Sequence, residues 1–237
     1  MTVGFPKGRY VARFATSAAD VVACQKLRHR CFFGKSGVDL DQFDVSWSHL
    51  MIEDGTNGPL VCTFRMRQSS AAAVQDGYAG QFYDLSGLAQ TAGPHIEIGR
   101  FCTDPATPDP HILRVAWGAL TQYVDACEAT ILFGCTSLTG TDPAPYARVI
   151  RALQDRYQGP HALMPGAIAP EVIRFGEPMG DADQRPMPPL LRTYLAMGGW
   201  VSDHAVVDRT MDTLHVLTVV EIAKIPPARA RALRALV

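Results

Sequence analysis

Hydrophobic and polar positions along the chain change between a period of two and a helical period, and this predicts the order of elements. Strands are expected at 10–15, 49–54, 59–67, 95–103, 130–138 and 214–222. Helices are expected at 17–33, 111–129, 142–157 and 189–199. A short strand is expected within EVIRFGE at 171–177, and a short basic helix in the tail at 226–237. This order predicts an α/β sandwich around a mixed central sheet flanked by helices, in one domain spanning residues 1–237.

The strand HIEIGRFCT at 95–103 carries two charged residues in an otherwise apolar pattern, Glu97 and Arg100. Carboxylates are depleted from strand interiors, and an unpaired buried one is costly. Strict alternation would place these two side chains on opposite faces, whereas a bulge at Gly99 would re-aim them. The segment is therefore either an edge strand with solvated charges or a strand that carries a functional carboxylate.

A second charged feature joins the first helix to the loop after it. Arg28 lies in the middle of the apolar helix face, so it needs an anionic partner or ligand unless its head group reaches water. The loop at 34–48 holds Asp39, Asp41 and Asp44. These carboxylates are expected to be solvated or to bind the cationic end of a small substrate.

Composition excludes several classes of function. The 237 residues are 47% hydrophobic and have a net charge of −1, so no basic field indicates nucleic acid. The six cysteines form no C-x-x-C pair, and no signal peptide or membrane span is evident, which is typical of a cytoplasmic protein with reduced thiols. Motifs for dinucleotides, nucleoside triphosphates, serine hydrolases and metals are missing. His49 and His95 are expected to be structural.

The strand order, with a carboxylate on the central strand, resembles the GNAT acyltransferase superfamily, and more closely the ornithine–acyl-carrier-protein N-acyltransferases. That family is related to acyl-homoserine-lactone synthases. The resemblance runs from about Tyr10 to Ile225. It rests on the blocks LRHRCFF, FDVSWSHLMIED, TFRM, EIGRFC, LFGCTSLTGTDP and PPLLRTYLAMGGWVSDHAVVDR. It implies a GNAT-like fold.

The resemblance also implies which residues form the site. Glu97 and Arg100 match its E-x-G-R signature and are the expected catalytic residues. The expected substrate-binding residues are Arg28, Phe32, Asp44, Arg65, Gly99 and Asp208, the last followed by Arg209 in a D-R pair. The chain departs from the family in a shorter loop at 34–42, in Phe101 where serine is common, and in a loop at 104–110 without the usual arginine. These departures leave the acceptor amino acid open.

The reaction implied is acylation of the α-amine of ornithine, the first step of ornithine lipid synthesis, with a 3-hydroxyacyl chain carried by acyl carrier protein. Glu97 is expected to take the proton from the amine, and amides near Gly99 to stabilise the oxyanion. Arg28, Arg65 and Arg100 would bind the acceptor carboxylate or hold Glu97 and Asp44 in a charge network. The loop DPATPDP at 104–110 has three prolines and no glycine, so a pyrophosphate cradle for coenzyme A is not expected.

No metal and no cofactor is therefore expected beyond the phosphopantetheine of the carrier protein. The alternatives are the same reaction on glutamine or another amino acid, an acyl-homoserine-lactone synthase that uses S-adenosylmethionine, and a non-catalytic protein that binds acyl carriers. The tail offers Arg229, Arg231 and Arg234 beside apolar residues. It is expected to dock on an anionic inner-membrane surface or on the acidic carrier protein, or else to fray.

Overall fold

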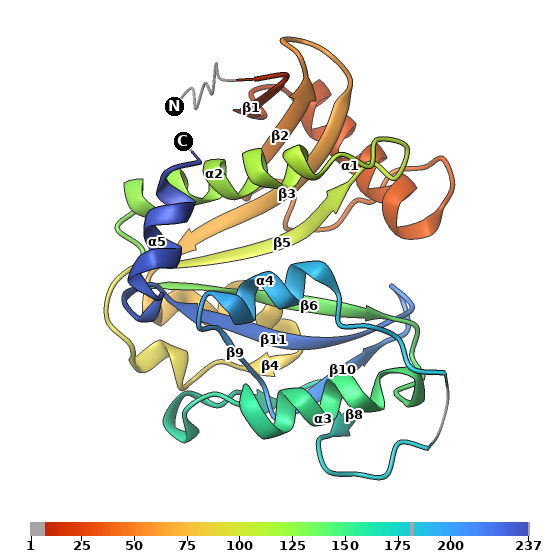
Figure 1. The fold of residues 1–237 in the computed structure, drawn as a ribbon, viewed down its shortest axis with the longest axis vertical. Helices are drawn as coiled ribbons and strands as arrows, with labels where there is room; N and C mark the ends of the chain where they lie inside the picture. Colours follow the sequence, from red (N-terminus) through yellow and green to blue (C-terminus); the bar gives the residue numbers. More distant parts are fainter. Residues whose placement is uncertain (1–7, 181–182, 237) are drawn as a thin grey trace. The chain divides into compact units, whose positions relative to one another are not determined.

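The computed structural model describes residues 8–180 and 183–236, which divide into two compact units (Figure 1). Unit 1 comprises Met1–Gln68, Ile98–Glu128 and Pro227–Val237, and unit 2 comprises Ser69–Glu97 and Ala129–Pro226. The strand β5 (His95–Thr103) is divided between them. It contributes Glu97 to unit 2, whereas Gly99 and Arg100 belong to unit 1.

Unit 1 contains an antiparallel sheet in the order β1-β2-β3-β5. Its first three strands are β1 (Tyr10–Phe14), β2 (Ser48–Asp54) and β3 (Leu60–Ser69). Its helices are α1 (Ala18–Phe33), α2 (Pro110–Ala126) and α5 (Pro227–Arg234). α1 begins at a capping box between Ser17 and Asp20 and ends at Gly34, whose φ of 66° favours glycine.

Neighbouring residues of β3 show that α1 and α2 cover opposite faces of this sheet. Phe64 stacks on Phe101, which stacks in turn on Trp117 of α2. The next residue, Arg65, shares the carboxylate of Asp44 with α1. Because successive residues of a strand point to opposite faces, the first face is apolar and packs on α2, and the second carries charge and packs on α1.

Unit 2 has a longer sheet in which the first residues of β5 pair in parallel with β6 (Ile131–Thr139). β11 (Thr213–Glu221) pairs with β6 over nine positions in antiparallel register. β10 (His204–Asp208) and β8 (Val172–Arg174) extend the sheet, and β9 (Trp200–Val201) pairs with β11. A separate pair joins β4 (Tyr83–Asp84) to β7 (Gly166–Ala167). The helices are α3 (Ala147–Arg156) and α4 (Pro189–Ala196).

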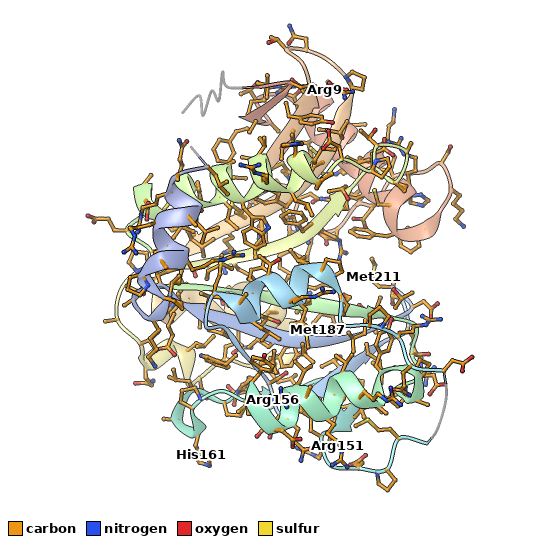
Figure 2. All side chains as sticks on the ribbon, in the orientation of Figure 1. Arg9, Arg151, Arg156, His161, Met187 and Met211 are labelled. Atoms are coloured by element: carbon orange, nitrogen blue, oxygen red, sulfur yellow. The ribbon has the colours of Figure 1, made fainter. Side chains whose placement is uncertain are left out.

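Each face of the unit 2 sheet has its own cover. α3 and α4 pack on the face that carries Leu138, Leu214 and Val216. The polar side of α3 is turned away from the sheet, and its exposed Arg151 and Arg156 are labelled in Figure 2. The opposite face, which carries Ile131, Phe133, Val206, Leu217 and Val219, is covered by residues between Val74 and Leu88. These include the short 3₁₀ helices Ala71–Asp76, Ala79–Gln81 and Leu88–Gln90.

The mixed α/β architecture predicted from the sequence is confirmed, and most element boundaries agree within a few residues. The strands β9 and β10 were not predicted, because they are short and follow directly on the helix that dominates the pattern before them. The expected helix at 142–157 begins as the 3₁₀ helix Ala144–Tyr146, and its α-helical part starts at Ala147. Two further 3₁₀ helices are His161–Leu163 and Ile222–Lys224.

Candidate active site

Glu97 lies on the covered face of the unit 2 sheet. Its register partner on β6 is Phe133, and residues opposite each other in a ladder share a face. The side chain is 1% exposed, and its Oε1 accepts a hydrogen bond of 2.6 Å from the backbone N–H of Ala79. Amide hydrogen bonds to a carboxylate are among the stronger ones in proteins. The alternative of a solvated edge charge is therefore wrong, and Glu97 is a buried carboxylate held in a fixed orientation.

Asp208 lies on that same face, since it is two residues from Val206 on β10. Its Oδ1 accepts hydrogen bonds of 3.0 Å from the N–H groups of Thr210 and Met211 and so caps the turn between β10 and β11. The neighbouring Arg209 pairs with Glu171 through two hydrogen bonds. These contacts give Asp208 a structural role, and its role towards substrate stays a prediction.

Arg28 has the anionic partners that its position on an apolar helix face requires. Its side chain is fully buried; Nη1 and Nη2 each lie 2.7 Å from one oxygen of Asp44. Its Nε lies 2.8 Å from Asp39, whose backbone oxygen also accepts from Nη2. Arg28 therefore does not extend its head group into water. It ties α1 to the loop that follows it.

Arg65 and Arg100 bind the same three carboxylates from the sheet side. Arg65 is 1% exposed and donates to both oxygens of Asp41, at 2.5 and 2.6 Å, and to Asp44 at 2.6 Å. Arg100 donates to Asp39 at 3.0 Å and to Asp41 at 3.3 Å. We call these six residues the Arg–Asp cluster: Arg28, Asp39, Asp41, Asp44, Arg65 and Arg100.

Burial and the neighbouring arginines shift the pKa of Asp44 and of Asp41 in opposite directions. Burial alone would raise the pKa of Asp44, but the hydrogen bonds and charge of Arg28, with the charge of Arg65 and a 3.0 Å hydrogen bond from Gln25, hold that pKa well below its usual value. Burial also opposes ionisation of Asp41, and Arg65 and Arg100 lower its pKa despite it. These two carboxylates therefore remain charged inside the protein, as buried paired charges do.

The irregularity expected at Gly99 is present in β5, and its left-handed residue is Arg100, with a φ of 55°. Arg100 reaches the cluster, and a Cβ built on Gly99 would meet Trp47 at 3.7 Å and Nε of Arg65 at 4.0 Å. Two successive residues thus face the same side, which a regular strand does not allow. A non-glycine residue with positive φ inside a strand is uncommon and concentrates at functional sites.

Aromatic side chains enclose the cluster. The guanidinium of Arg65 lies 5.0 Å from the ring of Trp47 and 5.7 Å from that of Phe43, both cation–π distances. Neither aromatic was predicted as a site residue, because only the folded loop brings them against β3. Phe32 is half-buried on α1. Three further apolar side chains, Phe64, Phe101 and Trp117, lie in the stack on α2.

Of the residues predicted from the sequence, the structure brings together Arg28, Asp44, Arg65, Gly99 and Arg100 in unit 1, and it places Glu97 and Asp208 on one face of unit 2. One expectation needs correction. Asp39 and Asp41 were expected to be solvated or to bind a substrate ammonium, but their oxygens accept hydrogen bonds from arginines of the chain itself. For Asp44 a charge network with the arginines was also expected, and Asp44 does pair with Arg28 and Arg65. Ala79 was missed, since its contribution is a backbone N–H that no sequence pattern marks.

His49, His95 and His215 are buried in the fold. Burial lowers the pKa of His49 and of His95, so both rings are neutral at pH 7. Burial lowers the pKa of His215 to about 4, and its Nδ1 lies 3.1 Å from the hydroxyl of Tyr83. All six cysteines are free. Among residues 8–180 and 183–236, no group of His, Cys, Asp or Glu is arranged to hold a metal ion.

Comparison with known proteins defines the class first. Residues 25–118 match the family described as an acetyltransferase (GNAT) domain. An N-acyl amino acid synthase from uncultured soil microbes superposes with a TM-score of 0.54 at 11% identity, covering 91% of this chain and 92% of that one. Fold and domain match together show a GNAT fold, which agrees with the fold expected from the sequence.

Curated relatives narrow this class to one family. The L-ornithine N(alpha)-acyltransferase of Rhodobacter capsulatus is 30% identical, with 90% of each chain aligned. The enzyme of the same name from Brucella abortus is 28% identical over 92% of this chain and 86% of its own. The chain belongs to the L-ornithine N(alpha)-acyltransferase family.

Proposed function

We propose that this enzyme transfers a 3-hydroxyacyl chain from acyl carrier protein to the α-amine of ornithine, the first step of ornithine lipid synthesis. The acceptor and the position of acylation follow from the names of the curated relatives, which align over nearly the whole chain. The observation that carries the chemistry is Glu97, a buried carboxylate fixed by the N–H of Ala79.

The reaction needs a base because the α-amine of an amino acid is largely protonated at neutral pH. Glu97 accepts that proton, directly or through a water, and the free amine attacks the thioester carbonyl. Attack forms the C–N bond and an oxyanion at the carbonyl carbon, and collapse of this intermediate breaks the C–S bond. The second proton that the nitrogen loses passes to the leaving sulfur, so the carrier leaves as its thiol. Backbone N–H groups beside the Gly99–Arg100 irregularity are the proposed donors to the oxyanion.

The choice of carrier protein over coenzyme A rests on the backbone before α2. Pro105, Pro108 and Pro110 have no N–H group. Every other N–H from 104 to 112 already has an acceptor within the loop or in β3: those of Asp104, Ala106, Thr107, Asp109, His111 and Ile112. The carboxylate of Asp109 itself caps the helix. A pyrophosphate would meet no free amide and a negative charge at the place where helix N-termini usually bind phosphate.

Within the Arg–Asp cluster, we assign the acceptor carboxylate to Arg100. Its side chain is 12% exposed, against 0% for Arg28 and 1% for Arg65. Its hydrogen bonds to the cluster, 3.0 and 3.3 Å, are also longer than those of the other two arginines. Arg28 and Arg65 accordingly serve to hold the loop and α1 in place.

The donor assignment is tested by steady-state kinetics with purified enzyme, ornithine, and the same 3-hydroxyacyl chain on either acyl carrier protein or coenzyme A. We expect turnover with the carrier protein and a kcat/KM lower by at least about a hundredfold with coenzyme A, as for loss of several phosphate contacts. Comparable values for the two donors would contradict the assignment of the carrier protein, while leaving acylation of ornithine intact.

A further inference from the structure

Large apolar side chains are exposed mainly on one part of unit 1. Six such side chains are exposed among the described residues, and five of them lie on α1 or in the loop that follows it. The five are Val22, Phe33, Val38, Leu40 and Val45. Leu40 is 69% exposed and Val45 is 93% exposed. Single exposed apolar residues are ordinary, but a group of them on one surface indicates something that binds there.

The loop from 34 to 47 has its polarity reversed. Asp39 and Asp44 are buried against arginines, and Asp41 is half-buried against Arg65. The residues that alternate with them, Val38 and Leu40, face outward. A surface loop that serves only stability would place its acids in water and its aliphatic side chains inside.

This exposure does not come from a loosely attached loop. The N–H of Asp39 donates to the carbonyl of Gln25 at 3.1 Å, and Nδ1 of His29 lies 2.9 Å from the carbonyl oxygen of Lys35. Gly37 packs so closely on His29 that a Cβ there would lie 2.4 Å from the ring. The loop therefore runs back along α1. Its aliphatic side chains are exposed on a backbone that these contacts fix.

The charges around these side chains are positive. Lys26 and Lys35 are exposed, and Val22, Lys26, His29 and Phe33 follow one stripe of α1 at spacings of three and four. Between residues 33 and 47 there is no fully exposed carboxylate, since the three acids are engaged with arginines. Aliphatic side chains with flanking lysines and without exposed acids suit an anionic lipid surface.

We propose that the surface formed by Val22, Lys26, Phe33, Lys35, Val38, Leu40 and Val45 inserts into the headgroup region of an anionic bilayer. We call it the aliphatic loop surface. The choice of a bilayer rests in part on the proposed function, because the product carries an acyl chain that partitions into lipid. Protein interfaces are instead enriched in tyrosine, tryptophan and arginine anchors, and this surface has none of them.

The tail suits this role less well than its sequence predicted. Leu233, from the face expected to meet a membrane, is buried, and α5 lies beside α2 (Figure 1). Arg234 forms two hydrogen bonds with Asp125 of α2, at 2.8 and 2.7 Å. The helix is thus docked on its own unit instead of frayed, and it presents Arg231 to solvent without a broad apolar face.

Vesicle co-sedimentation tests the proposal with the full chain. The vesicles are phosphatidylcholine alone or phosphatidylcholine mixed with phosphatidylglycerol. We expect the native chain to bind the mixed vesicles, and the double variant Leu40→Ser/Val45→Ser to bind them about tenfold more weakly or worse. Ile168→Ser is the matched control, since Ile168 is 51% exposed and belongs to unit 2. It should bind as the native chain does.

A second measurement reports insertion directly. The native tryptophans, Trp47, Trp117 and Trp200, are all buried, so Val45→Trp adds an exposed indole whose emission should shift to the blue with mixed vesicles and be quenched by brominated lipid. Native binding by the double variant, or an unshifted and unquenched indole, would overturn the proposal.

The assay also separates this inference from the proposed function. Turnover measured without vesicles should be unchanged in the double variant, because Leu40 and Val45 are exposed and neither belongs to the Arg–Asp cluster. A raised KM for the carrier protein together with unchanged vesicle binding would instead assign the surface to that protein and overturn the lipid proposal. If the double variant loses vesicle binding and the native chain binds vesicles but does not acylate ornithine, the membrane surface is supported and the proposed function is refuted.

Discussion

Asp44→Asn removes one charge from the centre of the Arg–Asp cluster. In the native chain this carboxylate accepts hydrogen bonds from Arg28, Arg65 and Gln25 at 2.6–3.0 Å. The amide keeps the shape of the side chain, but an NH2 group replaces one of the two acceptor oxygens. Its two N–H donors then face guanidinium groups that are donors themselves. Two fully buried cations then share one anion fewer, so breaking this pair should cost about 3–5 kcal/mol of the free energy of unfolding.

For a chain of this length, a loss of that size lowers the melting temperature by roughly 6–20 °C. Calorimetry and urea unfolding at pH 7 measure it. The matched control is Asp54→Asn, which breaks an exposed ion pair with Arg9 at the surface of unit 1 (Figure 2). Exposed pairs add little to stability because water screens their attraction, so the control should change the melting temperature very little. A loss for Asp44→Asn as small as that of the control would refute the view that the cluster holds α1, the loop and β3 together.

The pH dependence of the free energy of unfolding tests the role of Asp44 independently. Arg28 and Arg65 hold the pKa of Asp44 below its unfolded value, so its ionisation stabilises the fold above about pH 4 and loses that effect as the pH falls further. Native stability should therefore fall on acidification below about pH 4. Asp44→Asn should show a shallower fall over that range, and an equal slope for the two proteins would contradict the assignment.

Three further changes test the chemistry. Glu97→Gln keeps an acceptor for the N–H of Ala79 and should leave circular dichroism unchanged while lowering kcat by at least about a hundredfold; a near-native rate would remove Glu97 from the mechanism. Gly99→Ala introduces only ordinary contacts of 3.7 and 4.0 Å, so the melting temperature should stay the same while the KM for ornithine rises about tenfold. An unchanged KM would show that ornithine does not bind against this position. Arg231→Glu should raise the KM for the carrier protein about threefold or more at low salt only, and a change that persists at high salt would exclude steering by charge.

Local pattern was enough to predict most of the fold. The apolar run at 130–138 and the alternation at 214–222 became β6 and β11, which pair over nine residues. Ser17 and Asp20 marked the start of α1, because a capping box depends on residues three apart. β10 was not predicted, because five residues close to a helix are too few to show the period of two that distinguishes a strand from a loop.

The candidate site was predictable in its residue types but not in its partnerships. A guanidinium on an apolar helix face predicted that Arg28 has an anionic partner, and the structure supplies Asp39 and Asp44. The sequence did not reveal that Asp39 and Asp41 turn inward, since their orientation depends on arginines from α1, β3 and β5 meeting in three dimensions. The N–H of Ala79 is a backbone group and leaves no mark in the sequence at all.

The most direct test of the central claim is a competition between acceptors. Purified enzyme receives 3-hydroxyacyl carrier protein with ornithine and glutamine at equal concentration, and the products are identified by fragmentation in a mass spectrometer. We expect ornithine acylated on its α-amine to be the main product, and we expect this product to be lost in Glu97→Gln. Acylglutamine as the main product, acylation on the side-chain amine of ornithine, or undiminished product from Glu97→Gln would contradict it.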